Sequence, residues 1–173
     1  NAETFGVELD VKKNLDFIGL RGLSFVCNAA YIYSRVRFEE GAPERDRPLA
    51  GQSPYLVNAG FFYQYDDKGI SASLLYNRIG KRIESVGVPM QNQNEDIPDI
   101  YEMPRNSLDL TFSKKIGKIV EIKAGIQDML NSKVEYKQFV KLTDDKGGKS
   151  EREQLIRSYR PGVDINIGVS LRF

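Results

Sequence analysis

The chain has 173 residues, of which 40% are hydrophobic and 28% charged, and its formal net charge is +1. This composition is typical of one ordinary domain, and so small a charge, without a long basic stretch, gives no electrostatic reason to expect nucleic-acid binding. The chain has no histidine and one cysteine, Cys27, which argues against a zinc site, a Ser-His-Asp or Cys-His nucleophile and a disulfide framework. No apolar run approaches the ~20 residues of a membrane-spanning helix, but a transmembrane barrel fits this composition because only alternate strand residues face lipid.

Alternation of apolar and polar residues predicts strands along the whole chain. The first such segment alternates strictly through Phe5, Val7, Leu9 and Val11, and Cys27 falls in the apolar row of the next one, where a buried or lipid-facing thiol is expected. The predicted strands cover residues 4–13, 23–38, 54–65, a segment that starts at 70, 105–115, 120–127 and 159–173. We therefore predict an all-β fold, an antiparallel up-and-down meander of about seven long strands.

The connections between these strands alternate in length. Short ones cover residues 14–22, 66–69 and 116–118, and long ones cover 39–53, 84–104 and 128–157. In the turn 66–69, Gly69 is expected to take a positive φ. The last long connection contains strand-like pieces over 134–142 and 154–159 around the turn 144–148, which predict a hairpin. Short and long connections thus lie at opposite ends of the sheet, as in outer-membrane barrels with tight periplasmic turns and extended outer loops.

The final strand is two-faced and has the length of a membrane crossing. From Val163 every second residue is apolar, and a tilted strand crosses the bilayer in roughly 9 to 11 residues. The positions Asn166, Gly168, Leu171 and Phe173 resemble the C-terminal signal that delivers bacterial outer-membrane barrels to their assembly machinery. Leu171 departs mildly from that signal, which often has an aromatic residue there. The inner strand of a soluble sandwich alternates in the same way, so this strand alone does not decide between the two.

Residue types on the two faces favour the membrane interpretation. The polar positions are often Ser, Asn, Gly and Asp rather than Lys and Glu, which suits a crowded, wet barrel interior better than bulk water. Tyrosines near the expected strand ends are typical of interfacial girdles, although ordinary cross-strand packing explains them too. The tyrosines concerned are Tyr31, Tyr33, Tyr55, Tyr63, Tyr65 and Tyr76.

One run of residues resembles a known family. The run 47–55 with residue 58 is similar to the barrel of TonB-dependent outer-membrane receptors, in the branch with an N-terminal carboxypeptidase-regulatory-like domain. The residues that carry this resemblance are Arg47, Gly51, Gln52, Ser53, Pro54, Tyr55 and Asn58. Further pieces agree with it, in the same order as in the family: 75–83, 100–105 with Asp109, 127–131 and 159–162. Each piece is weak alone, and together they cover nearly the whole chain.

The resemblance implies a role in uptake across the outer membrane. The family's barrel has 22 strands around a plug, so residues 1–173 would form roughly its last third, and the plug and the segment that contacts TonB would lie elsewhere. The opening of the chain, without an initiator Met or a secretion signal, is interpreted in the same way. The implied partners are outer-membrane lipid, the barrel assembly machinery and the TonB complex. The loops 39–53, 84–104 and 128–157 are binding candidates by position only, and the transported substrate is left open.

Other functions stay open at this point. Lumen residues such as Asp109, Glu121 and Lys123 could contact a plug or a substrate, or could pair with one another across the sheet. A small structural or porin-like barrel would share the alternation and the terminal signal, and a soluble β-sandwich binding module would share the alternation alone. An enzyme is the least supported class, because the Asp pairs at 66–67 and 144–145 sit in Gly-containing turns and no cofactor or metal site is indicated.

Overall fold

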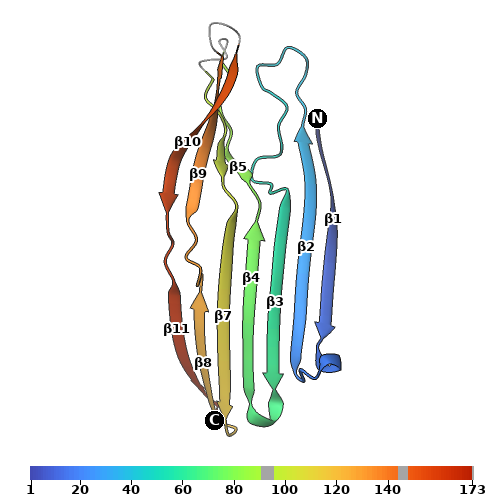
Figure 1. Ribbon diagram of the computed structural model, residues 1–173, viewed down its shortest axis with the longest axis vertical. Coiled ribbons are helices and arrows are strands. Elements are labelled where there is room, and N and C mark those ends of the chain that lie inside the picture. Colours follow the sequence, from blue (N-terminus) through green and yellow to red (C-terminus); the bar gives the residue numbers. More distant parts are fainter. Residues whose placement is uncertain (91–95, 144–147, 173) are drawn as a thin grey trace.

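The computed structural model describes residues 1–90, 96–143 and 148–172, and it is built almost entirely from antiparallel strands (Figure 1). Within these residues, no helix is long and apolar enough to cross a membrane. The phenylalanine at position 173, part of the expected assembly signal, lies outside the described residues, as do parts of the predicted loop 84–104 and of the turn 144–148.

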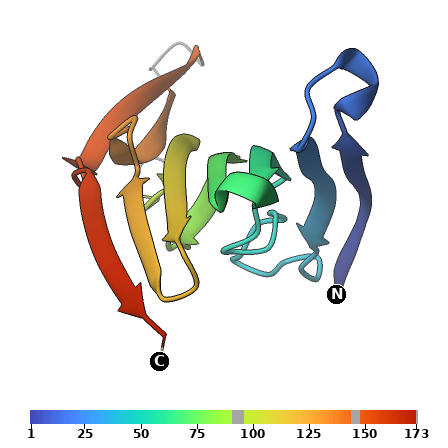
Figure 2. The same ribbon diagram turned by 90° about the horizontal axis from the view of Figure 1, so that it is seen from below.

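Seven long strands form one sheet, here named the wall sheet, in the order β1-β2-β3-β4-β7-β8-β11. They are β1 (Ala2–Asn14), β2 (Leu23–Val36), β3 (Tyr55–Tyr65), β4 (Ile70–Ile79), β7 (Arg105–Ile116), β8 (Val120–Gln127) and β11 (Asp164–Leu171). These are the seven predicted strands, and each pairs with the next of them along the chain, so the antiparallel meander is confirmed. The sheet is curved and open, with β1 and β11 at its two edges (Figure 2). No closed barrel forms among the described residues.

The register brings the predicted apolar rows onto one face of the wall sheet, here named the apolar face. One row runs across six strands without a break. Its members are Phe25, Phe61, Leu74, Leu110, Ile126 and Ile165. Cys27 belongs to the neighbouring row, between Val11 and Ala59, as predicted. Since successive side chains of a strand point to opposite sides, the Ser, Asn and Asp positions share the other side, the polar face.

Short and long connections lie at opposite ends of the wall sheet, as expected, and the two ends are named the turn end and the loop end (Figure 1). Two turns contain short 3-10 helices, Asp16–Ile18 and Asp66–Lys68. The second ends at Gly69, whose φ of 59° confirms the predicted left-handed conformation. The chain's last described residues lie at the turn end.

The last strand is shorter than predicted. Residues 159–173 do not form one strand, because Tyr159 ends an earlier strand and β11 begins only at Asp164. Pro161 has no backbone N–H to donate to a ladder, and Gly162 has a φ of 96°, so neither residue fits a regular strand. The alternation that begins at Val163 therefore locates the strand better than the tyrosine at 159.

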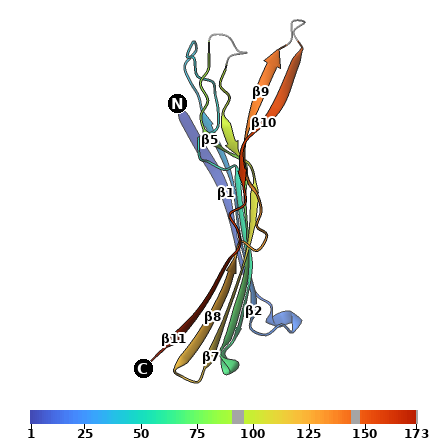
Figure 3. The same ribbon diagram turned by 90° about the vertical axis from the view of Figure 1, so that its left-hand side faces the viewer.

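Four further strands form a second sheet, the outer sheet, at the loop end. They are β5 (Arg82–Ser85), β6 (Ile100–Glu102), β9 (Val134–Thr143) and β10 (Lys149–Tyr159), in the order β10-β9-β6-β5. The predicted hairpin is confirmed by β9 and β10, which project beyond the wall sheet (Figure 3). The prediction of one long loop over 84–104 was wrong where β5 and β6 pair with each other. These strands have only four and three residues, too few for alternation to reveal them.

The outer sheet continues half of the wall sheet. Each outer strand is next along the chain to one wall strand: β5 follows β4, β6 precedes β7, β9 follows β8, and β10 precedes β11. The outer strands therefore stand in the same order across their sheet as these wall strands do in theirs. The wall strands are interrupted at one level, the seam, by residues 80–81, 103–104, 128–133 and 160–163. Breaker residues explain these interruptions: Pro104 lacks an N–H, and Asp128 and Asn131 have φ values of 53° and 43°. The buried apolar side chains of the described residues, Ile83, Val134 and Tyr136, all belong to the outer sheet.

Candidate functional site at the loop end

The run 47–55, which carries the family resemblance, folds against the seam. Gly51, with a φ of 78°, donates its N–H to the Ile83 carbonyl at 2.8 Å. The buried Ser53 hydroxyl donates to the Tyr55 carbonyl at 2.8 Å, and the same carbonyl accepts the Gly80 N–H at 3.0 Å. A Cβ on Gly80 would stand 2.9 Å from the Ser53 Oγ, so this approach requires glycine. These contacts attach the loop between β2 and β3 to the start of the outer sheet.

The remaining residues of this motif also make internal contacts. The backbones of Arg47 and Val36 form a two-way bridge, with N–H to carbonyl distances of 2.7 and 3.2 Å. The Gln52 side chain donates to the Ser53 carbonyl at 2.9 Å, and the Pro54 carbonyl accepts the Ile32 N–H at the same distance. Below the seam, the Asn58 Oδ1 accepts a 2.5 Å hydrogen bond from the Asn77 amide on the polar face. The motif therefore joins the loop to the two sheets by internal contacts, while Arg47 lines a hollow at the loop end and Asn58 lines another, smaller hollow.

The candidate assembly-signal residues lie along β11. The Asn166 side chain covers Gly125 of β8, where an added Cβ would stand 2.8 Å from its Oδ1. Gly168 faces open space, and Leu171 is exposed on the apolar face. Asn166 thus has a packing role, whereas nothing in the fold accounts for Gly168.

The three lumen candidates separate into two groups. The Asp109 carboxylate accepts the Asp128 N–H at 2.8 Å and so belongs to the seam. Glu121 and Lys123 lie two residues apart on β8 and form a 3.5 Å ion pair, and Arg172 approaches the same carboxylate at 3.7 Å. Glu121 and Lys123 therefore pair with one another, which was the alternative to contacting a plug or a substrate, but they pair along one strand rather than across the sheet.

A hollow of about 410 Å³ opens at the loop end, between residues 44–48, residues 86–89 and 96–99, and the strands β6, β9 and β10. Residues 86–90 and 96–99 form one of its walls, since Val88 and Ile97 bridge each other with two 2.9 Å hydrogen bonds. Arg45 forms an ion pair with Asp96, which joins two of the three predicted loops. The Met90 N–H donates to Asp96 at 2.7 Å, and this bond, with Arg45, lowers the pKa of that carboxyl.

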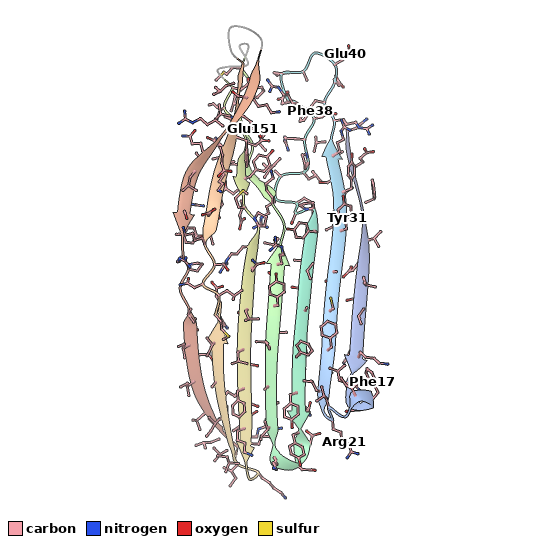
Figure 4. The ribbon with its side chains drawn as sticks, viewed as in Figure 1. Phe17, Arg21, Tyr31, Phe38, Glu40 and Glu151 are labelled. Carbon is pink, nitrogen blue, oxygen red and sulfur yellow. The ribbon has the colours of Figure 1, made fainter. Side chains whose placement is uncertain are left out.

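Two cations of the hollow rest on aromatic rings. Lys81 Nζ lies 4.6 Å from the ring centre of Tyr101 and 4.7 Å from that of Phe139, and these two rings meet edge to face. The Arg47 guanidinium lies 5.7 Å from the ring centre of Phe38. Such contacts hold a cation without neutralising it. Phe38, Glu40 and Glu151 mark this end in Figure 4, opposite Phe17 and Arg21 at the turn end.

The acidic side of the hollow contains Asp99 and Glu151. Asp99 accepts the Gly87 N–H at 2.8 Å and the Tyr101 hydroxyl at 3.4 Å. Burial of Tyr101 and the nearby Asp99 carboxylate raise the pKa of its phenol, which therefore stays protonated and donates. Glu151 stands opposite Lys141 in the β9–β10 ladder. The hollow thus combines aromatic walls with charges of both signs.

The sequence located this region by its loops. Lys81 and Tyr101 fall in the runs 75–83 and 100–105 that carried the family resemblance, but neither they nor Asp99 and Phe139 were named as candidate site residues. Their contacts join β6, β9 and the link between β4 and β5, which are far apart along the chain. The sequence itself offers only one indication of the hollow, which is the presence of aromatic and charged residues where the apolar–polar alternation stops. Among the described residues, no group of three or more Cys, Asp or Glu side chains stands close enough to hold a metal ion. No family model matches the chain, and no significant similarity to a curated protein or to a solved structure was found.

Proposed function

We propose that this chain forms part of the wall of an outer-membrane β-barrel, in a TonB-dependent receptor that takes up a ligand into the periplasm. The uncovered apolar face carries the proposal. Val7 and Ile167, on the two edge strands, are 74% and 76% exposed, and the central Phe61, Leu74 and Phe112 are also exposed. A soluble sandwich would cover such rows with a second sheet, whereas a barrel wall turns them to lipid.

Polar and aromatic groups border the apolar face toward the loop end. Asn106 Oδ1 accepts hydrogen bonds from the Tyr76 hydroxyl at 2.8 Å and from Arg78 at 2.7 Å, and Arg78 reaches the Tyr55 hydroxyl at 3.3 Å. Tyrosine and arginine with apolar stems and polar tips are typical of the membrane–water interface. This cluster marks one boundary of the lipid-facing band.

A second border lies toward the turn end. Lys114 donates to the Lys68 carbonyl, Lys68 lies 5.5 Å from the Tyr65 ring centre, and Lys13 lies 5.4 Å from that of Phe17. On β7 only apolar side chains stand on this face between Asn106 and Lys114. The nine residues from Asn106 to Lys114 fall within the roughly 9 to 11 residues of a tilted membrane-crossing strand.

The strand directions favour a larger barrel over a closed seven-stranded one. Six antiparallel pairings separate β1 from β11, so the two edge strands run in the same direction. Direct closure would pair them in parallel, which an antiparallel barrel excludes. An odd number of other strands is therefore needed between the two edges. The loop-end hollow and the resemblance to TonB-dependent receptors support a receptor over a purely structural barrel.

The lipid-facing assignment is tested by labelling neighbouring positions on β7. In a Cys27→Ser background, the Leu110→Cys and Thr111→Cys variants place one thiol on each face. After refolding into lipid bilayers, a water-soluble maleimide should label the Thr111→Cys variant and spare the Leu110→Cys variant, and a lipid-soluble maleimide should label the Leu110→Cys variant. Equal labelling by the water-soluble reagent would contradict the proposal.

The uptake function is tested separately. Accumulation of ligand in the periplasm by the receptor should stop when the inner-membrane proton gradient is collapsed, while binding of ligand at the cell surface persists.

A further inference from the structure

Two opposite charges in the hollow are held by one tyrosine without neutralising each other. The ring face of Tyr101 supports the Lys81 ammonium at 4.6 Å, and its hydroxyl donates to Asp99 at 3.4 Å. Neither Lys81 nor Asp99 takes part in an ion pair of the described residues. Because both contacts involve the same side chain, the two charges lie within roughly 11 Å of each other.

Both groups keep hydrogen-bonding capacity for a ligand. An ammonium has three N–H donors, and the contacts of Lys81 with Tyr101 and Phe139 use ring faces rather than acceptors. The Asp99 carboxylate has about four acceptor sites, and among the described residues Gly87 and Tyr101 donate to it. In contrast, the Arg45 and Asp96 charges in the same hollow are neutralised by each other. Lys81 and Asp99 therefore offer a ligand one positive and one negative charge that no ion pair of the described residues neutralises.

We propose that the hollow binds a short peptide or free amino acid as a zwitterion, with its carboxylate on Lys81 and its amino group on Asp99. This inference rests on the uptake function, since it identifies the class of ligand recognised at the loop end. An extended chain rises by about 3.3 to 3.6 Å per residue, so a span of this size admits one to three residues. The volume of about 410 Å³ falls within the usual range of ligand pockets. A neutral saccharide would satisfy neither charge.

Binding of trialanine to the 173-residue chain in detergent micelles tests this, with equilibrium dialysis as the measurement. Acetylating the amino terminus of trialanine, or amidating its carboxyl terminus, should each weaken binding about tenfold, the effect expected for one lost charge contact. Maltotriose should not bind. No trialanine binding at millimolar concentration, or equal binding of the blocked peptides, would overturn the inference, and these ligand-side comparisons need no protein variant.

Two variants assign the charges. Lys81→Gln should bind trialanine and its amide equally, while still rejecting the acetylated form. Asp99→Asn, whose amide oxygen can still accept the Gly87 N–H, should show the reverse preference. Lys118→Gln, at the turn end, should behave as the wild type, and a loss of both discriminations in either variant would argue for a structural role. The binding test does not require insertion into a bilayer, because it is done in micelles. If trialanine binds but the maleimide labelling of β7 is not face-specific, only the membrane proposal fails. If the labelling is face-specific but trialanine does not bind, only the peptide site fails.

Discussion

Arg105, the first residue of β7, forms an ion pair with Asp128, which follows the last residue of β8. Asp128 has a φ of 53°, and its N–H donates to Asp109 at 2.8 Å. Arg105 Nε and Asp128 Oδ1 are buried without a hydrogen-bond partner among the described residues. The pair thus fixes the seam at the point where the chain leaves β8 of the wall sheet toward β9 of the outer sheet, and β9 carries Phe139 to the hollow.

Substitutions at Asp128 should separate the ion pair from the backbone conformation. Asparagine tolerates a left-handed φ, so Asp128→Asn loses only the charge and should cost about 1–2 kcal/mol of unfolding free energy. Valine is β-branched, so Asp128→Val should cost about 1–3 kcal/mol more through backbone strain. Urea unfolding in micelles measures both. Lys123→Gln is the control, since the Lys123 side chain is 58% exposed and its 3.5 Å pair with Glu121 is expected to contribute roughly 0–1 kcal/mol. Equal stability of the valine and control variants would contradict the role assigned to the seam.

Gly60 and Leu75 define a second close approach, on the polar face. A Cβ on Gly60 would stand 2.5 Å from Leu75 Cδ2 and 3.1 Å from the Leu74 carbonyl oxygen. Gly60→Ala should therefore destabilise the sheet by about 1–3 kcal/mol, as overpacking does. In a Leu75→Ala background the additional cost should fall, because the nearer obstacle is gone. Gly168→Ala, where no atom lies within 4 Å, should be neutral in the same unfolding measurement. An unchanged cost in the double variant would mean that the backbone contact dominates.

The wall sheet could be predicted because alternation and turn chemistry agree along it. Cys27 was placed in an apolar row by sequence alone, and the register joins it to Val11 and Ala59. Gly69 was likewise predicted from the turn that it closes. A shift of one residue would turn every row over, so a two-faced sheet specifies its register strongly.

The seam and the hollow could not be predicted because they depend on contacts between distant segments. The motif pieces at 47–55, 75–83, 100–105 and 127–131 were recognised separately, yet the structure brings part of each to one level. Ile83 is 1% exposed because it meets the run 47–55, and no local pattern indicates this. Lys81 lies beside Phe139 through the pairing of β6 with β9, which no periodicity specifies.

Lowering the pH should release the loops held by Asp46 and Asp96 only below the ordinary pKa range of aspartate. Asp46 accepts the Phe38 N–H at 3.2 Å and pairs with Arg35, and Asp96 is held likewise by Met90 and Arg45. In both carboxyls the backbone hydrogen bond, followed by the guanidinium, lowers the pKa. A lowered folded-state pKa means that the anchor is fully present above the unfolded value of about 3.9 and is lost as the pH falls through the folded value.

Amide resonances of Phe38 and Met90 in micelles report these two anchors directly. Both should titrate with midpoints below about 3.9. In the Asp96→Asn variant the Met90 titration should disappear and the Phe38 titration should remain. Midpoints at or above the ordinary value would show that the carboxylates are not held by these contacts.

In water without detergent, the 173-residue chain should self-associate. The edges β1 and β11 each have one unpaired side, and apolar rows extend onto both of them. Unpaired edges template further strand pairing, and a wide exposed apolar face associates with another such face. Light scattering should therefore give masses well above 19.6 kDa, and detergent should reduce them.

Two variants of β1 identify which surface drives this association. Val7→Lys places a charge on the apolar face, and Thr4→Lys places the same charge on the polar face of the same edge strand. If the apolar face dominates, only Val7→Lys should lower the scattering mass, whereas edge pairing would make the two variants equal. A stable detergent-free monomer of 19.6 kDa would mean that the apolar rows are packed on one another. The soluble-sandwich interpretation would then replace the membrane one, because a lipid-facing surface has no reason to be covered in water.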